Sequence, residues 1–252
     1  VVNNLSRNSI SSPISFADLD QDGDLDFFIS IYGEIIYYRN DNGSFKIQYG
    51  YNGDATQVGP WIPNPGNPGS SQGNPFDAIN NDLPGGIDYL SFAFADLDND
   101  GDMDVTVGYN EYSYYSNVEK ALFYYENKGL GVLELKEGLE SPVDGVDLKN
   151  HSNVSFADID GDGDLDALTS GSEVQNKYGI SSTYTYQELY KNDNGVFSLV
   201  TDPQQNPFSN LSFIGDANLK LFDLDKDGDL DLIAPYHVND SYYSEAKVQY
   251  FQ

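Results

Sequence analysis

The chain has 252 residues, 39% of them hydrophobic, which is enough for one large or two small domains with a hydrophobic core. Its 41 acidic and 12 basic residues give a formal net charge of −29. That charge argues against nucleic acid and anionic membranes as partners, because no basic patch can pair with phosphate. Cysteine is absent, which excludes disulfide bonds and thiolate metal sites.

The composition favours β structure and gives no sign of a membrane span. Tyrosine (20) and phenylalanine (14) are abundant, and 24 glycines and 11 prolines supply turns. Helical periodicity is absent, and no apolar run approaches the roughly 18 residues that a spanning helix needs. The first residue is Val rather than Met and no secretory leader is visible, so we expect a chain that is processed or is part of a longer protein.

The dominant feature is a nine-residue motif, Asp-x-Asp-x-Asp-Gly-Asp-x-Asp, which occurs four times. The copies lie at 18–26, 96–104, 158–166 and 223–231, at intervals of 78, 62 and 65 residues. Together they hold about half of all acidic residues. Because this many adjacent carboxylates repel one another unless a cation neutralises them, the motif predicts four metal-binding loops.

Short apolar or alternating runs surround each motif in the same order and predict four strands per repeat. First strands precede the motif, at 14–17, 90–95, 153–157 and 218–222. Second strands follow it, at 27–31, 105–107, 167–169 and 232–234. Third strands are rich in tyrosine, at 35–38, 121–125, 188–190 and 248–251. In three repeats an Asn-Gly or Asn-x-Gly turn then leads to a fourth strand, at 44–47, 132–135 and 196–200.

A four-stranded antiparallel unit of about 60 residues is typical of a β-propeller blade. One such sheet must stack on its neighbours to bury both faces. We therefore predict an all-β fold, a β-propeller of four blades that forms a single domain over residues 1–252. The fourth repeat stops at its third strand, and we expect residues 1–5 to complete it and close the ring. Otherwise the chain is a segment of a larger propeller or of a continuing array.

Two kinds of segment depart from the repeat. The first, Tyr49–Gly86, holds six prolines and the only tryptophan, Trp61, and is predicted to be either a loop ordered by packing or a flexible excursion. The second kind joins second and third strands and is rich in tyrosine and serine, at 110–120, 172–186 and 237–245.

Calcium is the cation that fits the loops best, because it takes about six to eight oxygen ligands in a forgiving geometry. We expect positions 1, 3, 5 and 9 to offer side-chain carboxylates, position 7 its backbone carbonyl, and the glycine at position 6 the sharp turn. Position 12 is apolar or Thr rather than acidic and falls in a predicted strand, so the loop is not part of an EF-hand. About four calcium ions are predicted, held by Asp18, Asp20, Asp22, Asp24, Asp26, Asp96, Asp98, Asp100, Asp102, Asp104, Asp158, Asp160, Asp162, Asp164, Asp166, Asp223, Asp225, Asp227, Asp229 and Asp231.

The stretch Phe16–Asp26, its three counterparts and the later Tyr-x-Asn-x-Asn-Gly turn resemble the FG-GAP/VCBS repeat family, whose calcium loops occur in integrin-α-type propellers and in many secreted bacterial proteins. The resemblance covers most of the chain. It implies calcium-loop propeller blades, in which calcium holds the blade together rather than taking part in catalysis. The family's propellers usually have seven blades, whereas this chain carries four motifs.

Catalysis has little support in the sequence. The two histidines, His151 and His237, lie in unrelated contexts, and no carboxylate pair, nucleophile elbow or phosphate loop stands out. Candidate glycosylation acceptors in Asn-x-Ser/Thr follow from a secreted setting: Asn4, Asn42, Asn150, Asn153, Asn210 and Asn239. Candidate ligand contacts are aromatic residues outside the repeat, which either pack between hairpins or form an exposed rim: Trp61, Tyr114, Tyr115, Tyr184, Tyr186, Tyr242 and Tyr243.

These observations predict a secreted or cell-surface, calcium-stabilised propeller without enzymatic activity. Its predicted role is adhesion or assembly, through a protein or glycan at a surface or through self-association. Two alternatives are a carbohydrate-binding, lectin-like propeller and an accessory domain of a larger secreted enzyme. Glycan binding would distinguish the first alternative from self-association. A catalytic domain in the sequence beyond residues 1 and 252 would establish the second.

Overall fold

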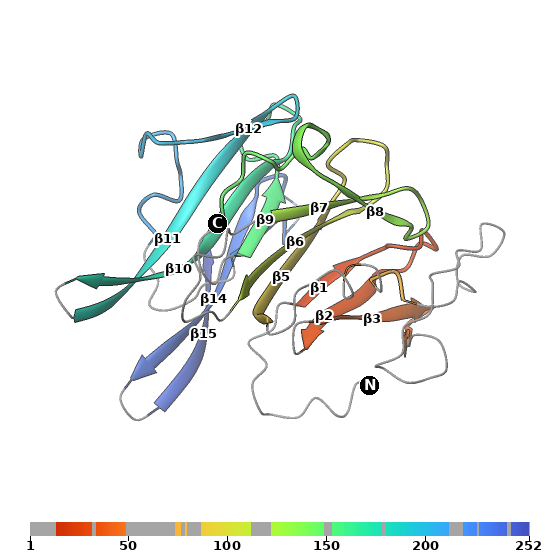
Figure 1. The fold of residues 1–252 in the computed structure, drawn as a ribbon, viewed down its shortest axis with the longest axis horizontal. Helices are drawn as coiled ribbons and strands as arrows, with labels where there is room; N and C mark the ends of the chain where they lie inside the picture. Colours follow the sequence, from red (N-terminus) through yellow and green to blue (C-terminus); the bar gives the residue numbers. More distant parts are fainter. Residues whose placement is uncertain are drawn as a thin grey trace. The chain divides into compact units, whose positions relative to one another are not determined.

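The computed structural model describes residues 14–31, 34–48, 74–76, 79, 87–111, 122–148, 153–177, 180–211, 219–225, 227–240 and 243–251. These residues form four antiparallel sheets, with one short 3-10 helix at Gly138–Glu140 (Figure 1). In each sheet the strands that are neighbours in sequence are also neighbours in space. The prediction of an all-β fold made of blade-like sheets is confirmed.

The strands follow the predicted order in every repeat. The first sheet contains β1 (Ile14–Ala17), β2 (Asp26–Ile31), β3 (Glu34–Asp41) and β4 (Ser44–Ile47). The second contains β5 (Ile87–Ala95), β6 (Asp104–Glu111), β7 (Leu122–Asn127) and β8 (Leu133–Lys136). The third contains β9 (Asn153–Ala157), β10 (Asp166–Lys177), β11 (Ile180–Asp193) and β12 (Val196–Leu199). The fourth contains β13 (Lys220–Phe222), β14 (Asp231–Asp240) and β15 (Tyr243–Phe251).

The fourth sheet has three strands among the described residues. The strand that we expect from residues 1–5 lies outside the described part of the chain. Closure of the four sheets into a ring, and the assignment of residues 1–252 to one domain, therefore remain predictions.

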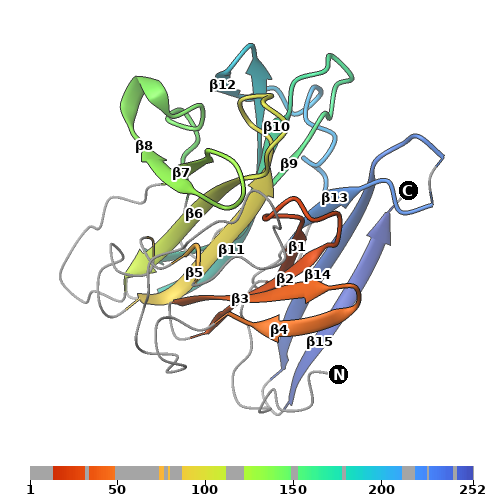
Figure 2. The same cartoon turned by 90° about the vertical axis from the view of Figure 1, so that its right-hand side faces the viewer.

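Two segments that the sequence analysis treated as connections between strands are themselves strands. The β10–β11 pairing continues to Lys177 opposite Ile180, and the β14–β15 pairing continues to Asp240 opposite Tyr243. Both hairpins therefore run well past the shorter first strands of their sheets, as the long β14–β15 pair in Figure 2 illustrates. The alternation of threonine with tyrosine at 183–186 suits a two-stranded ladder, so the second and third strands run beyond the ranges predicted for them.

The turns between third and fourth strands are two-residue hairpins in the first and third sheets. Asp41 pairs with Ser44, and the intervening Asn42 and Gly43 have φ of 53° and 82°. Asn194 and Gly195 repeat this geometry with φ of 53° and 86°. Two consecutive positive φ values match the right-handed twist of the strands, and Asn-Gly is the sequence that tolerates them best, as predicted.

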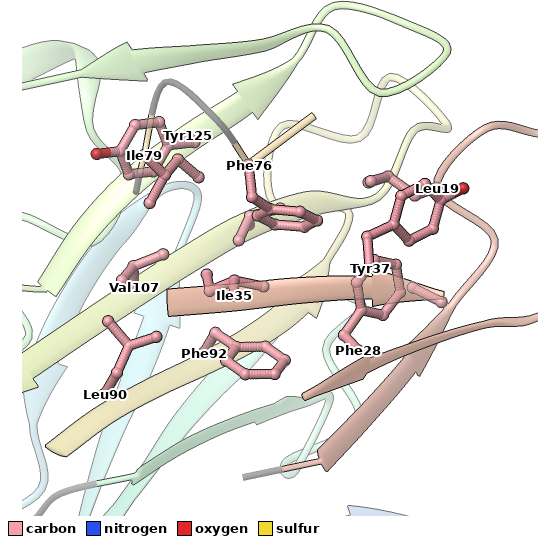
Figure 3. Close-up of a cluster of buried hydrophobic side chains, with 12 residues drawn as sticks. Leu19, Phe28, Ile35, Tyr37, Phe76, Ile79, Leu90, Phe92, Val107 and Tyr125 are labelled. Carbon is pink, nitrogen blue, oxygen red and sulfur yellow. The ribbon is translucent and has the colours of Figure 1, made fainter. Parts of the chain in front are cut away.

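Chain contacts divide the protein into two compact units, one formed by Val1–Val118 with Phe123–Lys136 and the other by Glu119–Leu122 with Glu137–Gln252. In the first unit, one face of the first sheet packs on the second sheet. Phe28 is fully buried, with its ring stacked on Tyr37 at 5.2 Å and tilted against Phe94 at 4.4 Å. The core also takes Leu90, Phe92, Val105 and Val107 from the second sheet (Figure 3).

The proline-rich segment between the first two sheets also reaches this core. Phe76 and Ile79 are fully buried, and the Phe76 ring lies edge-on to Phe28 at 5.5 Å. Figure 3 shows both side chains among those of the two sheets. This part of Tyr49–Gly86 is thus ordered by packing, whereas Trp61 lies outside the described residues.

In the second unit, the third and fourth sheets meet through a smaller cluster of Leu168, Leu219, Leu232 and Ala234. Backbone amides of the fourth repeat also donate to serines of the third sheet. Leu219 N donates to Ser170 Oγ at 3.4 Å, and Leu221 N to Ser155 Oγ at 3.3 Å. Within each unit, neighbouring sheets therefore stack as blades must to bury their faces.

Candidate metal centres

Each acidic motif connects the first and second strands of its sheet. Its positions are numbered 1 to 9 from the first aspartate. Position 9 is in every case the first residue of the second strand and is buried: Asp26, Asp104, Asp166 and Asp231. The loop is therefore held at both ends by a strand pair, which fixes where its carboxylates gather.

The glycine at position 6 makes the turn that the sequence predicts. Its φ lies between 93° and 99° in all four loops, a region that residues with a Cβ rarely adopt. Its amide donates to the carboxylate at position 1, over 3.0 to 3.1 Å. The loop thus wraps around the first aspartate.

Aspartates two or more positions apart converge in each loop. In the first loop the carboxylates of Asp18, Asp20 and Asp22 offer oxygens within 4.8 Å of one another. In the other three loops positions 1, 3 and 9 do so, the groups being Asp96–Asp98–Asp104, Asp158–Asp160–Asp166 and Asp223–Asp225–Asp231. Such triads of oxygen ligands can hold a hard divalent cation.

The aspartate at position 9 is also fixed by the sheet. In the first loop, Asp26 accepts hydrogen bonds from the Asn40 backbone amide at 2.8 Å and from the Tyr37 hydroxyl at 2.9 Å. In the second loop, Asp104 accepts the corresponding bonds from Asn127 and Tyr124, each at 2.9 Å. These bonds orient the carboxylate without using all of its lone pairs.

An asparagine at the end of the third strand ties the loop to the next turn, a role that the sequence analysis missed. The Asn40 side chain donates to Leu25 O at 3.0 Å and accepts from Gly43 N at 2.7 Å. Asn192 makes the same pair of bonds, to Leu165 O at 3.1 Å and from Gly195 N at 2.8 Å. The sequence signal was present, since these asparagines open the Asn-x-x-Gly turns, but it indicated only a turn.

At position 7 the side chain turns to the neighbouring hairpin. Asp24 Oδ2 accepts from Asn42 N at 2.7 Å, and Asp164 Oδ2 accepts from Asn194 N at 2.8 Å. These bonds engage the position-7 carboxylate outside its loop; that position 7 offers a cation its backbone carbonyl stays a prediction.

Asp20 provides the test of whether a cation fits these residues. It is fully buried, and neither of its carboxylate oxygens has a hydrogen-bond partner among the described residues. Burial raises its pKa to about 6, with the neighbouring Asp22 charge acting in the same direction. A buried carboxylate without a partner is costly, whereas a cation held with Asp18 and Asp22 would satisfy it. The donor set therefore fits a divalent cation.

The pKa values predict how the metal-free protein responds to pH. Burial raises the pKa of Asp26 to about 7, well above the usual value of an aspartate. Between about pH 4 and pH 7 the folded state keeps a proton that the unfolded state has lost, so stability falls as pH rises through this range, by up to about 4 kcal/mol. Thermal melts in EDTA from pH 5 to pH 8 should show this fall. In excess calcium the fall should vanish or reverse, and equal slopes in both conditions would contradict the expectation.

The candidate ligand-contact aromatics fall mostly outside this geometry. Tyr184 and Tyr243 lie in β11 and β15, and Tyr186 in β11 is half-buried. The others lie outside the described residues: Trp61, Tyr114, Tyr115 and Tyr242. The candidate tyrosines that the structure describes, Tyr184, Tyr186 and Tyr243, thus lie on the two long hairpins.

The candidate glycosylation sites differ in exposure. Asn42, in the β3–β4 turn, and Asn210 are exposed. Asn153 is only 3% exposed and begins β9, which makes it a poor acceptor. Asn239 lies in β14, and Asn4 and Asn150 lie outside the described residues.

No family model and no curated protein matches the chain. Six chains of solved structures do. One is a chain of an Agrocybe aegerita lectin whose structure concerns the specific recognition of non-reducing terminal N-acetylglucosamine. The sequence identity is 16% and the TM-score 0.37, over 93% of this chain and 65% of the lectin's length. Among the described residues no helix is long and apolar enough to cross a membrane.

Proposed function

We propose that this chain is a calcium-binding, calcium-stabilised module of FG-GAP/VCBS-type blades that works outside the cell as a non-catalytic adhesion or assembly unit. The observation that carries the calcium assignment is the buried carboxylate of Asp20, which has no hydrogen-bond partner among the described residues and lies with those of Asp18 and Asp22. Calcium suits these loops because their donors are all oxygens and their spacing allows an irregular, many-sided coordination. Each ion would tie the first strand to the second within its sheet.

The adhesion role is supported by the separation, in the chain, of acidic loops that bond internally from hairpins that do not repeat. The four loops use their polar groups on one another and on the adjacent turns, as the bonds of Asp18, Asp26 and Asn40 show. Surfaces for a partner are left to the parts that do not repeat, above all the extensions of β10–β11 and β14–β15 with Tyr184 and Tyr243. Long hairpins on rigid sheets are suited to holding contact residues in place.

A glycan is the alternative partner, because tyrosine rings can stack on sugars. A glycan array with calcium-loaded protein would reveal such binding. A clean negative, together with calcium-dependent self-association in light scattering, would favour homotypic assembly. A catalytic domain in the full-length gene would instead make this chain the accessory part of a secreted enzyme.

Replacing Asp20 tests the calcium assignment directly. Asp20→Asn removes a charged ligand while keeping the volume, so calorimetric titration of metal-free protein should show one fewer calcium ion per chain, and the rise in melting temperature on adding calcium should shrink. The matched control is Asp24→Asn, because the Asp24 side chain bonds to the Asn42 amide and an asparagine oxygen can replace it. Unchanged stoichiometry in Asp20→Asn would refute the first-loop site.

A further inference from the structure

One position on the third strand carries a charged side chain of a different kind in each of three repeats, a cation in the first and third and an anion in the second. Arg39, Glu126 and Lys191 each immediately precede the asparagine that bonds to the position-9 aspartate. Because that bond sets the register of the strand against the loop, the three side chains occupy equivalent places beside their loops. Their interactions with the acidic clusters nevertheless differ.

In the second repeat this residue adds a carboxylate to the loop. Glu126 offers an oxygen within 4.8 Å of oxygens of Asp98 and Asp100. Lys136 lies 3.1 Å from one Glu126 oxygen, and Lys128 also pairs with the side chain. These lysines offset the charge of Glu126 and hold it in place, so the second loop gains a fixed oxygen donor rather than net negative charge.

In the third repeat the same position supplies a cation instead. The Lys191 ammonium pairs with Asp160 and lies 3.7 Å from Asp162 Oδ2. Asp160 belongs to the triad that would bind the metal ion. A divalent cation in this loop must therefore displace the lysine or share an oxygen with it.

In the first repeat the charge is directed elsewhere. The Arg39 guanidinium makes two bonds to Asp41, at 3.1 and 3.3 Å, and its side chain is only 9% exposed. The Arg39 charge also acts to lower the pKa of Asp20, although the Asp20 carboxylate accepts no hydrogen bond among the described residues. The first loop thus neither gains a carboxylate nor has a lysine in its triad.

We propose that this third-strand position sets the calcium affinity of each loop, so that the second loop binds most tightly, the first less tightly and the third most weakly. The proposal rests on calcium binding at the loops as the function of these sites. Its physical basis is that affinity in oxygen-ligand loops follows the charge of the ligands and the rigidity of the site. Lys191 pairs with a triad carboxylate and lowers the charge that the third loop offers, whereas Glu126 adds to the second loop an oxygen ligand held in place by two lysines. As calcium falls, the third loop empties before the first two.

The loop glycines allow each site to be titrated separately. The amides of Gly23, Gly101, Gly163 and Gly228 each donate to the position-1 aspartate of their own loop. Amide resonances of these glycines, followed by NMR while calcium is added to the metal-free full chain, therefore report one midpoint per loop. In the wild type we expect the Gly101 midpoint at the lowest calcium concentration and, among the first three loops, the Gly163 midpoint at the highest.

Two substitutions should move these midpoints in opposite directions. Lys191→Gln removes the competing charge and should lower the Gly163 midpoint about tenfold, and Glu126→Gln removes a carboxylate and should raise the Gly101 midpoint by a similar factor. Lys191→Arg keeps the charge and should leave the third loop weakest. Lys46→Gln makes the same charge change in the other unit, where Lys46 pairs with Asp41, and should leave the Gly163 midpoint within about twofold.

The outcomes distinguish failure of the affinity proposal from failure of calcium binding itself. A wild-type protein whose loop glycines do not respond to calcium would overturn both. If the glycines respond, but the midpoints of Lys191→Gln and Glu126→Gln coincide with those of the wild type, calcium binding is supported. The proposal that the third-strand position sets the affinity is then refuted. Shifts of both midpoints in the stated directions, with the Lys46→Gln control unchanged, support the proposal.

Discussion

Excess EDTA is expected to lower the melting temperature of this protein by about 10 to 20 °C. Each of the two compact units contains two acidic loops. If calcium is present at about 100 times its dissociation constant, each bound ion contributes about 2.7 kcal/mol, or roughly 5 kcal/mol per unit. For domains of this size that free energy corresponds to a shift of this order. Removing the ions also leaves clustered carboxylates such as those of Asp18, Asp20 and Asp22 to repel one another.

The measurement is a pair of thermal melts by circular dichroism at pH 7.5, one in EDTA and one in calcium. Adding calcium in excess over the EDTA should restore the higher melting temperature, which separates loss of the ion from irreversible damage. Elemental analysis of the purified protein should find about four calcium ions per chain. An identical melt in EDTA, with no metal found, would refute calcium stabilisation and leave the loops as solvated acidic turns.

Substituting Phe28 is expected to be the most destabilising single change in the first unit. Its ring is fully buried and contacts the rings of Tyr37, Phe76 and Phe94, which come from three separate segments of the chain. Phe28→Ala leaves a cavity where they meet and should cost about 3 to 5 kcal/mol. That loss is comparable with the whole stability of a typical domain, so partial unfolding at 37 °C is expected.

Phe16→Ala is the matched control for this change. Phe16 lies on β1, opposite Phe27 in the register, and its side chain is 56% exposed. The same truncation there should cost less than about 1 kcal/mol. Urea denaturation in the presence of calcium would measure both variants, and equal losses would show that the aromatic cluster around Phe28 is not the core of this unit.

Much of each repeat could be predicted from sequence because its determinants are local. Alternating apolar residues fix the strands, and a glycine at position 6 fixes the loop turn, with φ near 95° in all four copies. The Asn-Gly turns at Asn42 and Asn194 likewise require only their own two residues. The position of each acidic loop between the first and second strands follows directly from this order.

The long hairpins show where local reasoning failed. Residues 172–186 are mostly polar and end in Thr183-Tyr184-Thr185-Tyr186, a composition compatible with both a loop and a strand. Only the pairing of β10 with β11, from Ala167–Tyr190 to Lys177–Ile180, decided between the two. The burial of Phe76 and Ile79 was equally hidden, because the prolines around them indicate a loop but not what that loop covers.

By itself, the sequence determined the repeat, the sheets and the positions of the acidic loops, because these depend on residues close together along the chain. Tertiary structure decided how the carboxylates differ. It buried Asp20 without a hydrogen-bond partner in the described part of the chain, brought Glu126 to the second loop and paired Lys191 with Asp160. These differences arise between residues on separate strands, where the identity of one third-strand side chain determines the charge that a loop presents to a cation. Four nearly identical motifs therefore become sites of unequal charge.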